Sequence, residues 1–150
     1  MTNDEWYIGV CKEIAENSKC LSRKIVAIIV KDKSIIAQGY NGPPRGVDHC
    51  NVRHKYDSNL LVKYKKLDQY FDPNIEVTKF PRQIMGFKSG EGLEWCIAGH
   101  AERNCICQAA RMGVSIKGTT MYMDCPVPCK ECIISIINSV IKEIVCTEIS

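Results

Sequence analysis

The spacing of apolar residues changes several times along the chain, and each change predicts a new element. Near the N-terminus, apolar residues recur at helical spacing at Tyr7, Cys11 and Ile14. Thr2 is followed three residues later by Glu5, which is the pattern of a capping box at a helix start. We therefore expect a first helix that runs to about residue 17.

Two β-branched runs follow this helix, KIVAIIVKD at 24–32 and SIIAQGYN at 34–41. The short polar break between them predicts a hairpin, and the unbroken apolar run predicts a first strand that is buried on both faces. Turn residues, NGPPRG at 41–46, end the hairpin. From about 51 to 90 the chain is more polar, and its amphipathic piece NLLVKYKKLDQYF at 59–71 predicts a helix in an inserted segment.

The C-terminal part alternates between helical and extended patterns. A helix is expected from His100 to Gly113, a strand over 119–125, a second helix over 129–140 and a last strand over 142–148. Such alternation requires crossover connections, so these later strands should lie parallel in one sheet covered by helices. The sequence thus predicts a single α/β domain over 1–150, with the element order α-β-β-α-β-α-β.

Composition and charge exclude several classes of protein. The 150 residues carry a formal net charge of +3, with basic and acidic residues interspersed, which is too little to indicate a nucleic-acid surface. No stretch approaches the ~20 apolar residues of a membrane span, and the N-terminus lacks the pattern of a signal peptide. We expect a cytoplasmic protein with no membrane partner.

Ten cysteines are many for a chain of this length. In a reducing compartment such a number indicates metal binding or catalysis more than disulfide bridges. Four of them stand among apolar neighbours and are expected to be core residues, namely Cys11, Cys105, Cys107 and Cys146.

Two others, Cys129 and Cys132, stand three residues apart at a predicted helix start, directly after Pro128. A helix N-terminus and a nearby cation lower thiol pKa values, so we expect both to be thiolates. His100 begins the other helix, and three nitrogen and sulfur ligands suit a catalytic zinc with an open fourth position. Glu102, two residues after His100, could then move a proton at that position. Taken alone, His100 and Glu102 also fit an ordinary helix terminus with a first-turn acid.

The order H-A-E, then P-C-x-x-C with a strand between, is the signature of the zinc deaminases. Together with HAERN at 100–104, GYNGPPRG at 39–46 and SRKIVAIIV at 22–30, it makes the chain resemble the cytidine and deoxycytidylate deaminase superfamily, most closely its dCMP deaminases. This resemblance implies a three-layer fold with a mixed sheet and a zinc cofactor held by His100, Cys129 and Cys132. It implies Glu102 as the proton shuttle in hydrolysis of dCMP to dUMP, which supplies dUMP for thymidylate synthesis.

Several residues are candidates for contacts with the nucleotide. Asn41 resembles the family residue that binds the sugar, although a turn asparagine is the simpler interpretation. For the 5′-phosphate we expect Ser22, Arg23 and Lys24, which could equally form a solvated basic turn. The remaining candidates are Arg45, for phosphate or effector, and Ala101, between His100 and Glu102.

A second metal site is also suggested by the resemblance, because some family members hold another zinc with cysteines at positions like Cys20 and Cys50. Their histidine from the segment before H-A-E is missing here, and Cys96 stands in that segment instead. With His49 or His54 as a fourth ligand, this set would form a closed structural site. Buried or free thiols are the alternative.

Other substrates and functions remain open at this stage. The same core occurs in tRNA adenosine deaminases, the substrate could be dCTP, cytidine or cytosine, and a zinc-held regulatory domain would need no turnover. The family resemblance further implies dCTP and dTTP as effectors. Two features suggest a homo-oligomer, with a hexamer preferred. One is a small apolar face, and the other is that the sequence ends soon after the last predicted strand.

Overall fold

The computed structural model describes residues 1–21 and 23–147. They divide into two compact units. The first contains residues 1–18, 24–41 and everything described from Gly99 onward, and the second contains residues 19–23 and 42–98. The second unit therefore includes the whole of the polar segment that the sequence sets apart at 51–90.

The first unit is built on a four-stranded sheet. Its strands are β1 (Val26–Lys31), β2 (Ser34–Tyr40), β3 (Thr120–Met123) and β4 (Glu143–Cys146), in the order β2-β1-β3-β4. β1 is antiparallel to both β2 and β3, whereas β3 and β4 are parallel. The mixed sheet is confirmed, and so is the expectation that the two later strands run parallel.

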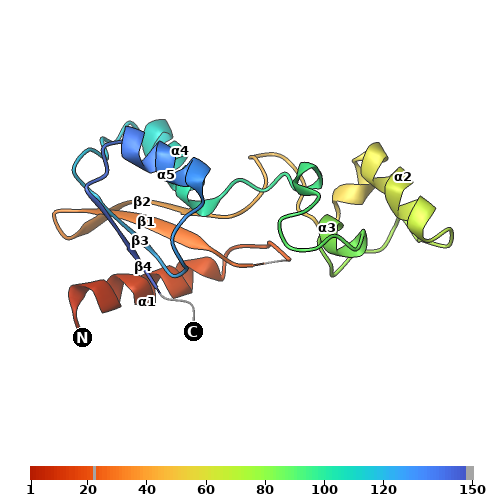
Figure 1. Cartoon of the computed structure of the whole chain (residues 1–150), viewed down its shortest axis with the longest axis horizontal. Helices are drawn as coiled ribbons and strands as arrows, with labels where there is room; N and C mark the ends of the chain where they lie inside the picture. Colours follow the sequence, from red (N-terminus) through yellow and green to blue (C-terminus); the bar gives the residue numbers. More distant parts are fainter. Residues whose placement is uncertain (22, 148–150) are drawn as a thin grey trace. The chain divides into compact units, whose positions relative to one another are not determined.

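Helices cover both faces of this sheet (Figure 1). Helix α1 (Asn3–Ala15) lies on one face, and helices α4 (Ala101–Met112) and α5 (Lys130–Asn138) lie on the other. The central strand β1 is buried on both sides: Val26, Ile28 and Val30 join the core of α1, while Ala27 and Ile29 join the core of α4 and α5. The three-layer α/β fold is thus confirmed.

Local sequence signals set the ends of these elements. The Thr2 and Glu5 capping box is formed in full, although α1 ends at Ala15, two residues earlier than predicted. The hairpin turns at Asp32 and Lys33, whose φ angles of 49° and 60° match the primed turns that suit twisted strands. Gly113 ends α4 in the left-handed conformation with φ 69°, as its position in the sequence predicts.

The second unit holds a helix, α2 (Ser58–Leu67), a short helix, α3 (Pro81–Ile84), and the 3-10 turns η1 (Arg53–Lys55) and η2 (Leu93–Trp95). Helix α2 ends four residues before the predicted end, because residues 68–71 form a turn closed by the Phe71 N–H and the Asp68 carbonyl at 3.0 Å.

Aromatic rings form the core of this second unit. The His54, Tyr64 and Phe71 rings contact one another, and the His54 Nε2 donates to the Ile75 carbonyl at 2.9 Å. Within the described residues, the His54 Nδ1 and the Tyr64 hydroxyl are buried without a hydrogen-bond partner.

The cysteines expected in the core differ in their burial. Cys11 and Cys105 are fully buried, and Cys146 is partly buried against the core of α4 and α5. Cys107 is exposed, so its assignment to the core is wrong. The reason is helical geometry: two residues after the inward-facing Cys105, the side chain has turned by about 200° to the outer face of α4.

No helix among the described residues is long and apolar enough to cross a lipid bilayer.

Helix α4 approaches β2 so closely at Gly39 that no side chain fits between them. A Cβ at Gly39 would lie 2.7 Å from the Ala101 carbonyl oxygen and would overlap the backbone of Cys105. These are backbone atoms of the first turns of α4, which cannot give way as the end of a flexible side chain can. The glycine therefore fixes how near the start of α4 comes to the sheet.

We predict that Gly39→Ala lowers the free energy of unfolding by about 1–3 kcal/mol, the usual cost of overpacking. Urea unfolding followed by circular dichroism measures this change. The matched control is Gly9→Ala in α1, where an added Cβ meets nothing within 4 Å and should stabilise the helix by about 0.5–1 kcal/mol. Equal unfolding midpoints for the two variants would contradict the close contact at Gly39.

Candidate metal centre and active site

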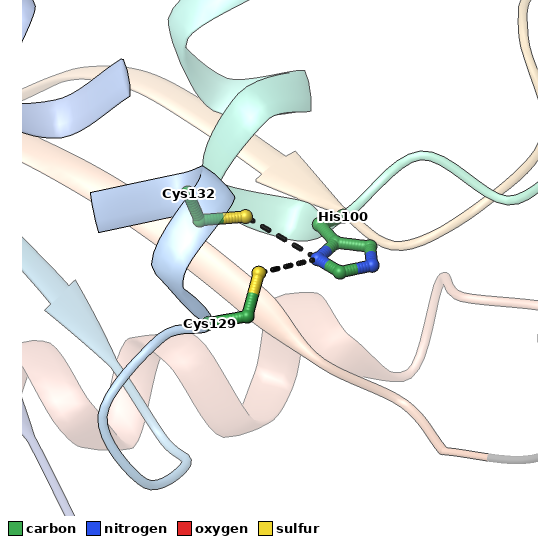
Figure 2. Close-up of side chains that lie close together, drawn as sticks. All are labelled: His100, Cys129 and Cys132. Atoms are coloured by element: carbon green, nitrogen blue, oxygen red, sulfur yellow. Dashed lines mark hydrogen bonds between the residues drawn. The ribbon is translucent and has the colours of Figure 1, made fainter. Parts of the chain in front are cut away.

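Three potential metal ligands meet at the starts of α4 and α5 (Figure 2). His100 is the N-cap residue of α4, Cys129 is the N-cap residue of α5, and Cys132 lies in the first turn of α5. The His100 Nδ1 lies 3.2 Å from the Cys132 Sγ and 3.5 Å from the Cys129 Sγ. Among the described residues, this is the one set of three His, Cys, Asp or Glu ligand atoms that all lie within 4.8 Å of one another.

The spacing of these atoms fits a tetrahedral zinc. With Zn–S near 2.3 Å and Zn–N near 2.0 Å, the nitrogen and sulfur ligands of one zinc lie about 3.5 Å apart, close to the two distances seen here. One nitrogen and two sulfurs are also the donor types that zinc prefers. Among the described residues, no fourth ligand joins this group. A tetrahedral metal held here would therefore keep one coordination position that the group does not fill.

The Cys132 thiol is buried, and its pKa is raised rather than lowered. Burial is the largest cause, and the neighbouring Glu102 and Cys129 raise the pKa further. The prediction that both cysteines are thiolates included a nearby cation, and in its absence burial raises the pKa of Cys132. A bound divalent cation reverses this balance and deprotonates the thiol.

Glu102 lies beside the three ligands without joining them. It is 5% exposed in the first turn of α4, and it is near enough to Cys132 to raise the pKa of that thiol. Glu102 is therefore a buried neighbour of the ligand group. A carboxylate in this position can reach a molecule bound at the open coordination position. The geometry therefore fits the proton-transfer role that the sequence predicts for it.

Asn41 stands just after β2, and its carboxamide is oriented by the fold. Its Oδ1 accepts the Ile25 N–H and the Ser18 hydroxyl, both at 2.9 Å. The sequence suggested an amide that offers both a donor and an acceptor to a sugar hydroxyl. The Oδ1 thus serves the fold as an acceptor of two hydrogen bonds, and the contact with a sugar stays a prediction.

The other nucleotide candidates are spread over the chain. Ser22 lies outside the described residues. Arg23 and Arg45 are exposed residues of the second unit, and Lys24, in the first unit, forms an exposed ion pair with Glu16 at 3.3 Å. Ala101 is 1% exposed, so it offers almost no surface to a substrate in this structure.

The residues suggested for a second metal all belong to the second unit, and their ligand atoms are not gathered within 4.8 Å of one another as those of the first group are. Cys20 and Cys96 lie near enough to Cys50 that their charges raise its pKa, although burial is the larger cause. The Arg53 Nη1 donates to the Trp95 carbonyl at 2.7 Å, which ties the Cys96 segment to the segment of Cys50. His49 is half-buried beside Gly42.

Two residues that hold the site were not found from the sequence. Ser18 is buried, and its hydroxyl donates to the side chain and the backbone carbonyl of Asn41. Asn104 donates to the backbone carbonyls of Tyr40 and Gly99. Asn104 ends the motif HAERN, so a signal existed in its case, whereas nothing in the sequence links Ser18 to Asn41.

Comparison with known proteins agrees with this geometry. The family model for the cytidine and deoxycytidylate deaminase zinc-binding region matches residues 1–148. The deoxycytidylate deaminase of Enterobacteria phage T2 is 36% identical over 140 residues, which cover 90% of this chain and 74% of the phage protein. The deoxycytidylate deaminase of Schizosaccharomyces pombe is 28% identical over 142 residues, 95% of this chain and 36% of the yeast protein.

A solved structure shares the fold. The dCMP deaminase from the cyanophage S-TIM5, in complex with dCMP and dUMP, matches with a TM-score of 0.62 at 22% identity. The match covers 95% of this chain and 78% of the cyanophage chain.

Proposed function

Because this chain belongs to the cytidine and deoxycytidylate deaminase zinc-binding family, we propose that it hydrolyses dCMP to dUMP and ammonia. The observation that carries the proposal is the meeting of His100, Cys129 and Cys132 at two helix starts, with the buried carboxylate of Glu102 beside them. The relatives named deoxycytidylate deaminase support dCMP as the substrate.

The ligand set assigns each side chain a task in binding the metal. The Nδ1 of His100 and the sulfurs of Cys129 and Cys132 would hold zinc. When bound there, zinc supplies a Lewis acid that lowers the pKa of a water molecule to about 7. The two cysteines come from one helix turn and the histidine from another helix, so the site depends on how α4 and α5 are held against the sheet.

Glu102 is the residue that moves protons in this proposal. Hydrolysis adds water at C4 of the cytosine and releases its exocyclic amine as ammonia. The Glu102 carboxylate accepts a proton from the attacking water and delivers it to the ring nitrogen N3. It then takes the second proton from the new C4 hydroxyl and delivers it to the exocyclic amine, so that C4 becomes a carbonyl and ammonia leaves. Burial of the carboxylate keeps bulk water from competing for that proton.

Nucleotide recognition is assigned to the residues that the sequence suggests for it. Asn41 binds a sugar hydroxyl, and Ser22, Arg23 and Lys24 bind the 5′-phosphate. Arg45 remains a candidate for the phosphate or for an effector, with dCTP and dTTP as the candidate effectors. A requirement for reduced cysteine ligands agrees with a cytoplasmic location.

Rival functions differ in what they require of the same residues. A zinc-held regulatory domain would gain nothing from a buried acid beside a three-ligand site, because structural zinc sites take four protein ligands. A tRNA deaminase would need a concentrated basic surface, and the small net charge of +3 argues against such a surface. Deamination of dCTP, cytidine or cytosine uses the same chemistry, so only kinetics separates these substrates from dCMP.

We further propose a second zinc held by Cys20, Cys50 and Cys96, with His49 or His54 as the fourth ligand. The proposal is supported by the nearness of Cys20 and Cys96 to Cys50, whose pKa they raise, and by the nearby positive charge of Arg53, which lowers it. The buried Nδ1 of His54, which lacks a partner among the described residues, is a suitable donor for such a site. Four protein ligands would make this zinc structural.

Assembly into a homo-oligomer, with the hexamer as the preferred form, is supported by apolar side chains on the outer side of α5. Ile134 and Ile137 in this helix and Val140 just after it are exposed. A second copy of the chain would remove this apolar surface from water.

Light scattering at micromolar concentration should therefore report a multiple of 16.9 kDa, and a monomer would contradict the proposal.

The function is tested by ammonia release from several substrates. The protein should release ammonia from dCMP with a higher kcat/KM than from deoxycytidine, because only dCMP offers a phosphate to the basic residues. Cytidine, cytosine, dCTP and a tRNA complete the panel. Equal kcat/KM values for dCMP and deoxycytidine would overturn the nucleotide assignment.

The control in the same assay is Glu102→Gln, which should lose a factor of about 10²–10⁴ in kcat while it keeps its zinc and its fold. Loss of zinc in this variant would show that Glu102 is a ligand and that its assigned role is wrong.

Metal analysis separates the two zinc sites. Protein that was never exposed to chelators should contain about two zinc ions per chain, by the ligand sets proposed above. Cys132→Ser should lose one ion together with activity, and Cys50→Ser should lose one ion and keep part of the activity. Cys107→Ser, which removes an exposed thiol of α4, is the matched control and should change neither. A content near one ion that Cys50→Ser leaves unchanged would rule out the second site.

A further inference from the structure

Two amide side chains of α4 bind the free edge of β2. Strand β2 is at one edge of the sheet, so alternate backbone groups on its outer side lack a strand partner. The Asn104 Nδ2 donates to the Tyr40 carbonyl at 2.9 Å, and the Gln38 N–H donates to the Gln108 Oε1 at 2.6 Å. Four residues of helix span about 6 Å, and two residues of strand span nearly the same distance, so the two pairs fit side by side.

Asn104 makes contacts that Gln108 does not make. Its Nδ2 also donates to the Gly99 carbonyl at 3.2 Å, and its backbone N–H donates to the His100 carbonyl at 2.9 Å. A Cβ at Gly99 would lie 2.5 Å from the Asn104 Oδ1, so the glycine leaves the room that this side chain occupies. Asn104 thus hydrogen-bonds with the carbonyl groups of both peptide bonds that flank His100.

The Tyr40 carbonyl, the other group that Asn104 binds, lies next in the chain to the candidate nucleotide contact. Tyr40 is followed by Asn41, whose own position is fixed by the Ile25 N–H and the Ser18 hydroxyl. One carboxamide, that of Asn104, therefore bridges the segment of the metal ligand His100 and the strand end that precedes Asn41.

We propose that Asn104 is a positioning residue that sets the metal ligand His100 and the nucleotide contact Asn41 at a fixed distance from each other. The proposal rests on the function proposed above for its catalytic consequence, but its effect on the metal ligand is independent of the substrate. Gln108 shares the contact of α4 with β2, one helix turn farther from the site, and serves that packing alone.

This difference makes Gln108 the matched control. Asn104→Ala and Gln108→Ala each remove one side-chain amide between α4 and β2, and urea unfolding reports how much each stabilises the fold. Asn104→Asp keeps the shape of the side chain and removes both Nδ2 donors, so it separates hydrogen bonding from packing. For each variant the KM and kcat for dCMP and the rate of zinc loss to a chromogenic chelator are measured.

Both Asn104 variants should raise the KM for dCMP and lower kcat/KM by about tenfold or more, as expected when reacting groups are misplaced by a fraction of an ångström. They should also release zinc faster than the wild-type protein. Gln108→Ala should alter stability only, with kinetic constants and zinc release within about twofold of the wild type.

Equal kinetic constants and equal zinc release in Asn104→Asp and Gln108→Ala would overturn the positioning role, whether or not Asn104→Ala folds. Absence of dCMP deamination in the wild-type protein would instead overturn the proposed function. The zinc-release rates would then still decide for or against the positioning role.

Discussion

The direct contact between the backbone of α4 and strand β2 at Gly39 is the constraint on which the site depends. It brings the first turn of α4 against the edge of the sheet, where Ala101 is buried and where His100 and Glu102 flank it. A larger residue at position 39 would move this turn outward and would carry the histidine away from the thiols of α5. Packing between helix and strand therefore sets the ligand geometry.

The chemistry of the site follows from burial as much as from residue type. Cys132 is fully buried and Glu102 nearly so, and in the absence of a cation both burial and the Glu102 carboxylate raise the pKa of Cys132. A divalent cation compensates both, so zinc binding and the charge state of the site are linked. In the function proposed above, the same burial lets the Glu102 carboxylate exchange a proton with a bound substrate and not with bulk solvent.

The sequence predicted the fold and the ligand group well, because both depend on local patterns. The β-branched run of β1, the capping box and the spacing of H-A-E and P-C-x-x-C are short-range signals. Contacts between distant segments were not predictable: Ser18 with Asn41, Asn104 with Tyr40, and the raised pKa of Cys132 depend on which residues the fold brings together. Cys107 was misassigned because apolar neighbours in a helix do not tell which face a residue occupies.

Cobalt substitution tests most directly that two helix starts form one metal site with an open position beside Glu102. In a Cys50→Ser background, which removes the second candidate site, Co²⁺ should give the intense visible bands of tetrahedral coordination and a thiolate charge-transfer band. The charge-transfer band should weaken in Cys129→Ser, and the visible bands should shift when dUMP is added. A spectrum that neither Cys129→Ser nor dUMP changes would contradict the account.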